Sequence, residues 1–264
     1  MPRIAAPGPE VFTEDPLGDA HVRCLEAIAT AAWPPAERRS VDGWVMRRSP
    51  AKTRRVNSTL VIRVDGGLTL AERIAAVEDY YTRHDQPPRF QISRAALPDG
   101  LDAELAVRGY QVEAPVDIQI AAPAGITRAG QVAPAGDIDI AARADDAWMA
   151  VYAEGFGRDV TTVTERIAAP TAFLSFRDGG AVVGVGLGVL EQGWLGLFGM
   201  LTRAERRGQG IGAAMAGRLA AWALEQGAVG VYLQVEKDNP GARRLYERLG
   251  FRTVYDYHYR TLFR

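Results

Sequence analysis

A glycine-rich loop between a strand-like run and an amphipathic helix constrains the fold of this chain most strongly. The loop runs from Arg207 to Ala213 and contains Gly208, Gly210 and Gly212. Glycine has no Cβ atom, so a ligand can approach its main-chain N–H groups, and the first turn of the next helix adds unpaired N–H groups and a positive dipole end. The pattern is typical of a pyrophosphate site. The simpler alternative is a turn that caps the helix without a ligand.

Two other nucleotide-binding loops fit this stretch less well. A Walker loop ends in Lys followed by Ser or Thr, where this chain has Gly212 and Ala213. The dinucleotide fingerprint G-x-G-x-x-G/A is satisfied by Gly208, Gly210 and Ala213, and Glu236 is a candidate ribose ligand. In that fold the first glycine follows its strand directly, whereas residues 202–207 intervene here, which disfavours this alternative.

Hydrophobic periodicity in the second half of the chain predicts a mixed sheet with helices. An antiparallel meander is expected from three strand-like runs with glycine-containing turns between them, at residues 171–177, 181–190 and 194–201. We then expect a helix with Ile211, Met215, Leu219 and Trp222 on one face, a strand over 229–235, a helix with Leu245 and Leu249 on one face, and a strand from Phe251. The Ala-, Gly- and Pro-rich stretch 121–136 has neither period, which predicts a linker.

The first half of the chain shows a similar order of elements. Strands are expected at 43–48, 56–64 and 89–93, helices at 69–84 and 101–108, and a last strand after Gly109. A shift of 141 residues (250 − 109) aligns Gly109 with Gly250 and the strand 89–93 with 230–234. This indicates an internal repeat, although helix-strand-helix order is also common by chance in mixed domains.

Composition excludes several classes of partner and site. The chain of 264 residues has 31 basic and 32 acidic residues, so its net charge of −1 gives no reason to expect nucleic acid or a membrane surface. Cys24 is the single cysteine, at helical spacing among apolar residues, so we expect a buried thiol, no disulfide and no metal site. The N-terminus lacks the pattern of a signal peptide, and a cytoplasmic protein is expected.

Residues 137–264 resemble the GNAT acetyltransferase superfamily. Arg207, Gly210 and Gly212 match its R/Q-x-x-G-x-G/A loop, and the segment 233–251 matches its second block, with an Asn and a helix that carries Leu-Tyr-Glu. The resemblance implies acetyl-CoA as cosubstrate and no metal. It implies a cofactor site formed by the strand residues Met200, Leu201 and Thr202, by Arg207, Gly208, Gln209, Gly210, Ile211, Gly212 and Ala213, and by Asn239.

The resemblance also implies that Tyr246 is the general acid that protonates the departing CoA thiolate. A phenol with a pKa of ~10 is protonated at neutral pH and can donate to a thiolate whose conjugate acid has a pKa of ~8.5. The alternative is that Tyr246 only fills the apolar face of its helix. The general base is less defined: Glu236, which lies two residues after Gln234 on the same face of its strand, is the candidate, and ordered water is the alternative.

At the aligned positions, the first half lacks most of these residues. Gly67 matches Gly208, but Thr69, Ala71 and Leu105 stand where the second half has Gly210, Gly212 and Tyr246. We therefore predict an α/β (mixed α+β) fold of tandem GNAT-like domains, each a mixed, mostly antiparallel sheet flanked by helices. Residues 1–120 are predicted to form a degenerate domain, 121–136 a linker and 137–264 the catalytic domain.

The whole chain resembles a two-domain bacterial subgroup of the superfamily. The resemblance is carried by a GWxxR hairpin, Gly43 to Arg47, and by an R-x-N-S strand, Arg55 to Ser58. Arg55, Asn57 and Ser58 are candidates for the acceptor site at the domain junction, with a polar edge strand as the alternative. The predicted function is transfer of an acetyl group to a primary amine of a small, amino-acid-like molecule. The rival is a non-catalytic acetyl-CoA-binding regulatory module.

Overall fold

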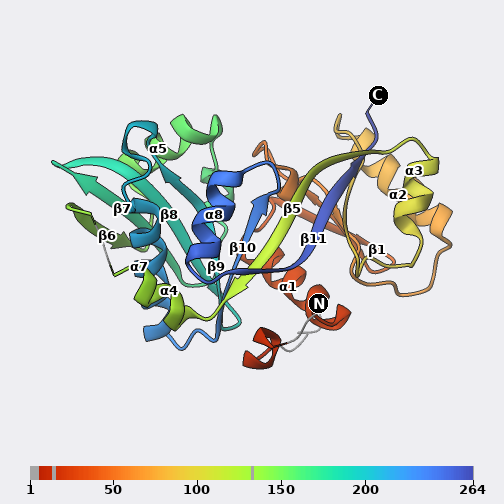
Figure 1. Ribbon diagram of the computed structural model, residues 1–264. Coiled ribbons are helices and arrows are strands. Elements are labelled where there is room, and N and C mark those ends of the chain that lie inside the picture. Colours follow the sequence, from red (N-terminus) through yellow and green to blue (C-terminus); the bar gives the residue numbers. More distant parts are fainter. Residues whose placement is uncertain (1–5, 14–15, 132–133, 264) are drawn as a thin grey trace.

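The computed structural model describes residues 6–13, 16–131 and 134–263, and its strands form one 11-stranded sheet (Figure 1). The strand order is β1-β2-β3-β4-β11-β5-β10-β9-β8-β7-β6. Only the pairs β3–β4 and β9–β10 of this sheet are parallel. The strands are β1 (Glu37–Val41), β2 (Trp44–Arg48), β3 (Thr59–Leu60), β4 (Arg89–Ser93), β5 (Gln111–Ala121), β6 (Asp137–Ala141), β7 (Thr171–Asp178), β8 (Ala181–Glu191), β9 (Trp194–Thr202), β10 (Gly230–Glu236) and β11 (Arg252–Thr261).

Helices cover both faces of this sheet. In the part formed by β6 to β10, side chains of α7 and α8 pack on one face, and side chains of α1 and α5 pack on the other. The α-helices are α1 (Asp19–Ala32), α2 (Leu70–Thr82), α3 (Leu101–Val107), α4 (Pro123–Ala129), α5 (Asp146–Phe156), α6 (Thr161–Thr164), α7 (Ile211–Glu225) and α8 (Pro240–Arg248). Short 3-10 turns are η1 (Pro9–Phe12), η2 (Arg54–Val56) and η3 (Ala204–Arg206). The mixed, mostly antiparallel sheet between helices confirms the predicted fold class.

Corresponding elements of the two halves keep the offset found in the sequence. Helices α2 and α7 begin 141 residues apart (211 − 70), as do strands β4 and β10 (230 − 89) and strands β5 and β11 (252 − 111). None of the described helices is long and apolar enough to cross a membrane.

The two halves exchange their last strands at the centre of the sheet. Strand β5, which ends the first half, pairs with β10 of the second half, whereas β11 pairs with β4 of the first half. The exchanged strands also pair with each other and lie side by side in the middle of the molecule (Figure 1). Each half therefore completes its part of the sheet with a strand of the other half.

Two stretches differ from their predicted structure. The predicted linker 121–136 contains α4, which packs on α7 so closely that a Cβ atom on Gly130 would lie 2.6 Å from the Cα atom of Gly217. Residues 132–133 of that stretch lie outside the described residues. The predicted strand 56–64 is reduced to β3, because η2 and the side chain of Asn57 hold the preceding residues in a turn.

Helix α1 joins the halves through a shared apolar core. Its residues pack with side chains of α5, β5, β8, β9 and β11. At the C-terminal end of α1, the ring of Trp33 stacks on Phe198 of β9 with centroids 5.1 Å apart. Both rings are almost fully buried, so this contact fixes the position of the N-terminal half against β9.

Candidate functional site

Strands β9 and β10 separate partway along their length. Their parallel pairing runs only from Trp194 and Gly230 to Leu197 and Leu233. Beyond that point β9 continues beside β8 and β10 continues beside β5, so the main chains of β9 and β10 face a gap. A bulge in β9, where Gly199 has a φ of +57°, turns this end of the strand further.

A cavity of about 400 Å³ opens at this gap. Its lining includes the ends of both strands, the start of α8, the end of α5 and residues of the N-terminal half. The aromatic, polar and charged side chains of the lining include Trp33, Arg54, Arg55, Phe156, Arg158, Phe198, Gln234, Glu236, Asn239, Tyr246, Tyr257 and Tyr259, and Met200 also lines the cavity. The volume is that of a small-molecule site.

The glycine loop joins the end of β9 to the start of α7. Gly208 and Gly210 have φ values of +76° and +85°, which side chains other than glycine adopt only with strain. The Arg207 side chain donates from Nε to the main-chain oxygen of Thr202 at 3.1 Å and so ties the loop to β9. The first α-helical bond runs from Ala214 N to the oxygen of Gly210, which leaves the N–H groups of the preceding turn outside the helical pattern.

Helix α8 places Tyr246 at the cavity. Asn239 caps the helix by accepting from the main-chain N–H of Ala242 at 3.0 Å, and Pro240 opens its first turn. The ring of Tyr246 packs edge-on against Phe251 with centroids 5.5 Å apart, and only 7% of the residue is exposed. Burial raises the pKa of Tyr246 to about 12, so the hydroxyl group stays protonated at neutral pH.

Polar groups of β10 and β11 form another wall of the cavity. Gln234 and Glu236 lie on the same side of β10, and Glu236 is exposed at the end of the strand. The Tyr257 hydroxyl of β11 donates to Oε1 of Gln234 at 3.0 Å, and it lies 3.4 Å from the hydroxyl of Tyr259. Strand exchange brings these two tyrosines to the site, because β11 pairs with β5 and β4 instead of pairing with β10 of its own half.

The two motifs of the N-terminal half have different roles in the structure. Arg47 of the GWxxR hairpin is buried and donates to the main-chain and side-chain oxygens of Ser58 at 2.9 and 2.8 Å. The amide of Asn57 donates to the main-chain oxygens of Ala51 and Thr53. These bonds hold a turn that presents Arg55 to the cavity. Asn57 and Ser58, the other two candidates for the acceptor site, do not line this cavity, and their side chains form bonds within the N-terminal half.

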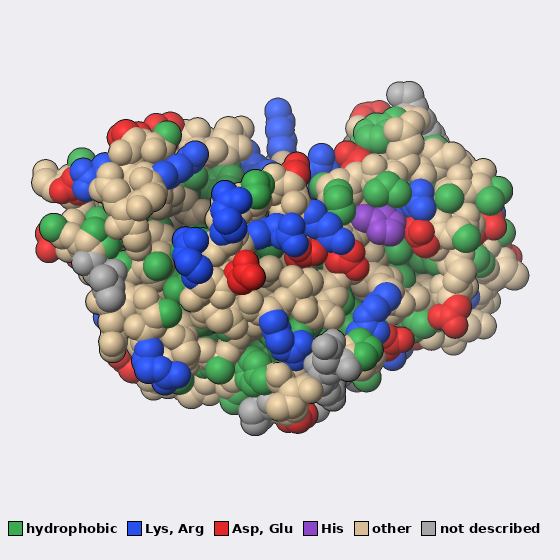
Figure 2. Space-filling view, in the orientation of Figure 1, with side chains coloured by type: hydrophobic (Ala, Val, Ile, Leu, Met, Phe, Trp, Pro, Cys, Tyr) green, Lys and Arg blue, Asp and Glu red, His purple; other side chains and the backbone are tan. Residues whose placement is uncertain are grey.

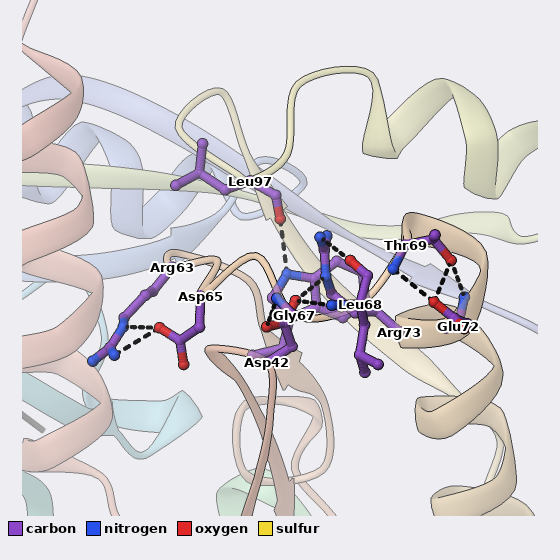
Figure 3. Close-up of polar contacts among 10 residues, drawn as sticks. Asp42, Arg63, Asp65, Gly67, Leu68, Thr69, Glu72, Arg73 and Leu97 are labelled. Carbon is purple, nitrogen blue, oxygen red and sulfur yellow. Dashed lines mark hydrogen bonds and ion pairs between the residues drawn. The ribbon is translucent and has the colours of Figure 1, made fainter.

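A carboxylate of the chain itself occupies the equivalent loop in the N-terminal half. Asp42 accepts from the N–H of Gly67 at 2.8 Å and from the N–H of Leu68 at 3.3 Å, and it pairs with Arg73 at 2.6 Å (Figure 3). The following helix α2 is capped by Thr69, which forms a reciprocal capping box with Glu72. The main-chain N–H groups of this loop are thus bound within the protein.

The structure brings some of the predicted site residues together and leaves others at a distance from the cavity. Met200, Glu236, Asn239 and Tyr246 line it. The loop residues Arg207 to Gly210 and the first residues of α7, Ile211 to Ala213, lie outside the lining, and the side chain of Leu201 packs against Gly155 of α5.

Sequence reasoning missed several residues of the cavity wall. They are Trp33, Arg158, Phe198, Tyr257 and Tyr259. Nothing in their local patterns marks them as site residues, whereas Arg55 of the N-terminal half belonged to a motif that the sequence singled out. Tyr152 and Phe156 lie four residues apart on one face of α5. They pack against the apolar core and also line the cavity.

The outer surface beside α8 differs in charge from the cavity. Basic side chains gather over α8 and the neighbouring middle part of β5 and β11, with acidic side chains beside them (Figure 2). Here Lys237 and Arg243 pair with the buried carboxylate of Asp117 at 3.7 and 3.2 Å. This surface is balanced, in contrast to the arginine-rich cavity.

Comparisons with known proteins agree with this geometry. A protein "Uncharacterized N-acetyltransferase YobR" from Bacillus subtilis is 27% identical over 247 residues, which cover 90% of this chain and 98% of the relative. The solved structure of a GCN5-related N-acetyltransferase from Kribbella flavida superposes with a TM-score of 0.70 at 17% identity, covering 90% of this chain and 94% of that one. A tandem GNAT protein from the clavulanic acid biosynthesis pathway gives a TM-score of 0.61 at 14% identity, covering 90% and 87%.

The family model described as "Probable histone acetyltransferase Rv0428c C-terminal" matches residues 19–260, which include both halves of the sheet and every wall of the cavity. Together with the separated strands, the glycine loop and the placement of Tyr246, this match establishes that the chain belongs to that family of GNAT N-acetyltransferases and is an acyl-CoA-dependent acetyltransferase.

Proposed function

We propose that this protein transfers an acetyl group from acetyl-CoA to a primary amine of a small, amino-acid-like molecule, with Tyr246 as the general acid. One observation carries the proposal: the cavity lies where β9 and β10 separate, and Tyr246 lines it from α8. An acyl-CoA arm placed along the free edge of β9 would bring its thioester to the cavity. The cavity of about 400 Å³ suits a small acceptor better than a folded macromolecule.

The pyrophosphate of the donor is assigned to the loop before α7. The main-chain N–H groups from Gln209 to Ala213 are the proposed ligands, supported by the positive φ values of Gly208 and Gly210 and by the dipole of α7. Met200, Leu201 and Thr202 provide the strand edge, and Asn239 is a proposed ligand of the pantetheine region. Arg207 is proposed to shape the loop through its bond to Thr202.

The proposed reaction is direct attack of the amine on the thioester. The new N–C bond forms, the S–C bond breaks, the amine loses a proton and the thiolate gains one. Tyr246 is suited to donate that second proton, because its pKa of about 12 keeps it protonated until the thiolate leaves. Glu236 is the proposed acceptor of the amine proton, directly or through water, since it is a carboxylate that lines the same cavity as Tyr246.

We further propose a division of roles between the halves. Residues 137–264 act as the catalytic domain, and residues 1–120 act as a degenerate GNAT-like domain that supplies acceptor-binding residues. The occupied loop at Asp42 supports the second part of this assignment.

Release of CoA thiol from acetyl-CoA, measured over a panel of amines, tests the proposed function. Turnover on at least one small amine, abolished in Tyr246→Phe while CoA binding persists, is the expected result. If CoA binds and no small amine, peptide or antibiotic is acetylated, the protein is instead a regulatory module that binds acetyl-CoA.

A further inference from the structure

Arg55 reaches the cavity from the N-terminal half and lies over a stacked aromatic pair. Its Cζ atom is 5.9 Å from the ring centroid of Trp33 and 5.5 Å from that of Phe198. Both distances lie within the range of a cation–π contact. The aromatic pair and the turn held by Asn57 therefore fix the guanidinium group in place before any ligand binds.

Within the described chain, the guanidinium group of Arg55 is only partly satisfied. Its Nε atom is buried and has no hydrogen-bond partner there. Its polar neighbours are the hydroxyl groups of Tyr257 and Tyr259. The buried carboxyl group of Glu26 accepts from the Gln91 amide and interacts electrostatically with Arg55, and burial raises its pKa to about 7. Arg55 thus lines the cavity as a charged guanidinium group.

The other charged residues of the lining also favour an anion. Arg158 lies 5.5 Å from the ring centroid of Phe156, and its buried Nε atom has no partner among the described residues. Arg54 pairs with Glu113 at 3.3 Å. Three arginines and one carboxylate, Glu236, therefore line the cavity. This excess of positive charge at the cavity wall favours an anionic ligand.

Building on the amine acetylation proposed above, we propose that the acceptor carries a carboxylate as well as its amine, and that Arg55 binds this carboxylate. The planar fork of a guanidinium group matches the two oxygens of a carboxylate. The acceptor class is that of free amino acids. A lysine side chain within a basic protein would bring further positive charge to a wall that already has three arginines.

Matched acceptors and matched variants test this carboxylate site. We would measure kcat/KM for thiol release with free amino acids and with the corresponding amino acid amides, which keep the amine and lose the charge. The variants are Arg55→Met, which keeps an unbranched apolar stem and removes the charge, Arg55→Lys, which keeps the charge but loses the fork, and Arg48→Met as the control. Arg48 pairs with Glu37 in the N-terminal half and does not line the cavity.

The wild type is expected to prefer each acid over its amide by about 10- to 100-fold, the contribution of a charged hydrogen-bonded pair. Arg55→Met should remove this preference, mainly through KM of the acids, and leave the amides within about threefold. The preference of Arg55→Lys for acids over amides should lie between that of the wild type and that of Arg55→Met. The preference of Arg48→Met should match the wild type. Equal rates on acids and amides in the wild type, or equal losses on both in Arg55→Met, would overturn the proposal. Preference for phosphoethanolamine or for a lysine-rich histone-tail peptide would also overturn it.

Calorimetry with N-acetyl amino acids and N-acetyl amino acid amides, in the presence of CoA, separates this proposal from the proposed function. Tighter binding of the acids that depends on Arg55 supports the carboxylate site even if no amine is acetylated. Acetylation of amines without any preference for acids, together with equal binding of both products, refutes the carboxylate site while the proposed function stands.

Discussion

The loops before α7 and α2 occupy equivalent positions, 141 residues apart, and differ in what their main-chain N–H groups bind. Before α7, Gly208 and Gly210 have positive φ values, and the N-cap residue Gly210 provides no side chain to cap the helix. Before α2, Asp42 accepts from Gly67 and Leu68, and Thr69 caps the helix with its own side chain. The proposed phosphate loop before α7 thus has, in the N-terminal half, a counterpart whose N–H groups already bind a carboxylate of the chain itself.

The halves also differ in what they contribute to the cavity where β9 and β10 separate. The C-terminal half provides β9, β10 and Tyr246, whereas the N-terminal half provides Trp33 and Arg55. A half without a ligand loop can still provide a wall of the site, because strand exchange and the packing of α1 fix it against β9. We infer that such exchange keeps the N-terminal half in place.

The largest expected effect comes from introducing a carboxylate side chain into each of the two loops and comparing the CoA affinities of the two variants. Gly210→Asp places a negative charge and a Cβ atom where we propose that pyrophosphate meets the main chain, and Asp tolerates a positive φ better than most residues. We expect CoA affinity to fall by about 100-fold or more, which corresponds to about 3 kcal/mol. Thr69→Asp introduces the same residue at the equivalent position, 141 residues earlier. It keeps a capping side chain and should leave CoA affinity unchanged. Calorimetry of both folded variants checks this, and unchanged affinity in Gly210→Asp would refute the loop assignment.

Tyrosine hydroxyl groups in the two halves provide the second test. Tyr246→Phe should lower turnover by about 10²- to 10⁴-fold while CoA binding changes little, because the variant loses the proposed proton donor and keeps the ring. The control is Tyr110→Phe, which removes a hydroxyl that donates to Glu78 at 2.9 Å in the N-terminal half. It should cost about 1 kcal/mol of unfolding free energy and leave turnover unchanged. A loss below tenfold in Tyr246→Phe would leave water as the proton donor.

Asp42→Ala tests whether the closed loop is only structural. The change leaves Arg73 without its carboxylate and frees the N–H groups of Gly67 and Leu68. We expect the thermal unfolding midpoint to fall by several degrees, with CoA stoichiometry still one per chain because Thr69 and Ala71 keep their side chains. Binding of a second CoA equivalent would show that Asp42 alone closes the N-terminal loop.

The smallest expected effect concerns Glu26 on α1, where the halves meet. Burial is the largest cause that raises its pKa from 4.5 to about 7 in the folded protein. Stability from the protonated form is therefore fully present below about pH 4.5 and is lost as pH rises through 7. Unfolding free energy of the wild type should fall between pH 5 and pH 8 by about 1–3 kcal/mol more than that of Glu26→Gln. Parallel pH profiles for the two proteins would contradict this assignment.

Much of the secondary structure follows from local patterns in the sequence. The predicted helix 69–84 is observed as α2, with Thr69 as its cap, and the predicted strands 171–177, 181–190 and 194–201 are observed as β7, β8 and β9 within one residue at each end. The strand predicted at 56–64 was wrong over most of its length. Its apolar alternation did not reveal that the Asn57 side chain would bond to the preceding turn.

The hydrophobic periods, the helix caps and a loop whose glycines permit positive φ values could all be predicted from the sequence, because each depends on neighbouring residues. These follow from steric limits and hydrogen bonds that act over a few positions. Two features became visible only in the three-dimensional structure: β5 and β11 exchange places, and Arg55, Phe198 and Tyr246 line one cavity. Such contacts join segments far apart in the chain, and pairing energies between distant strands leave no local pattern to read.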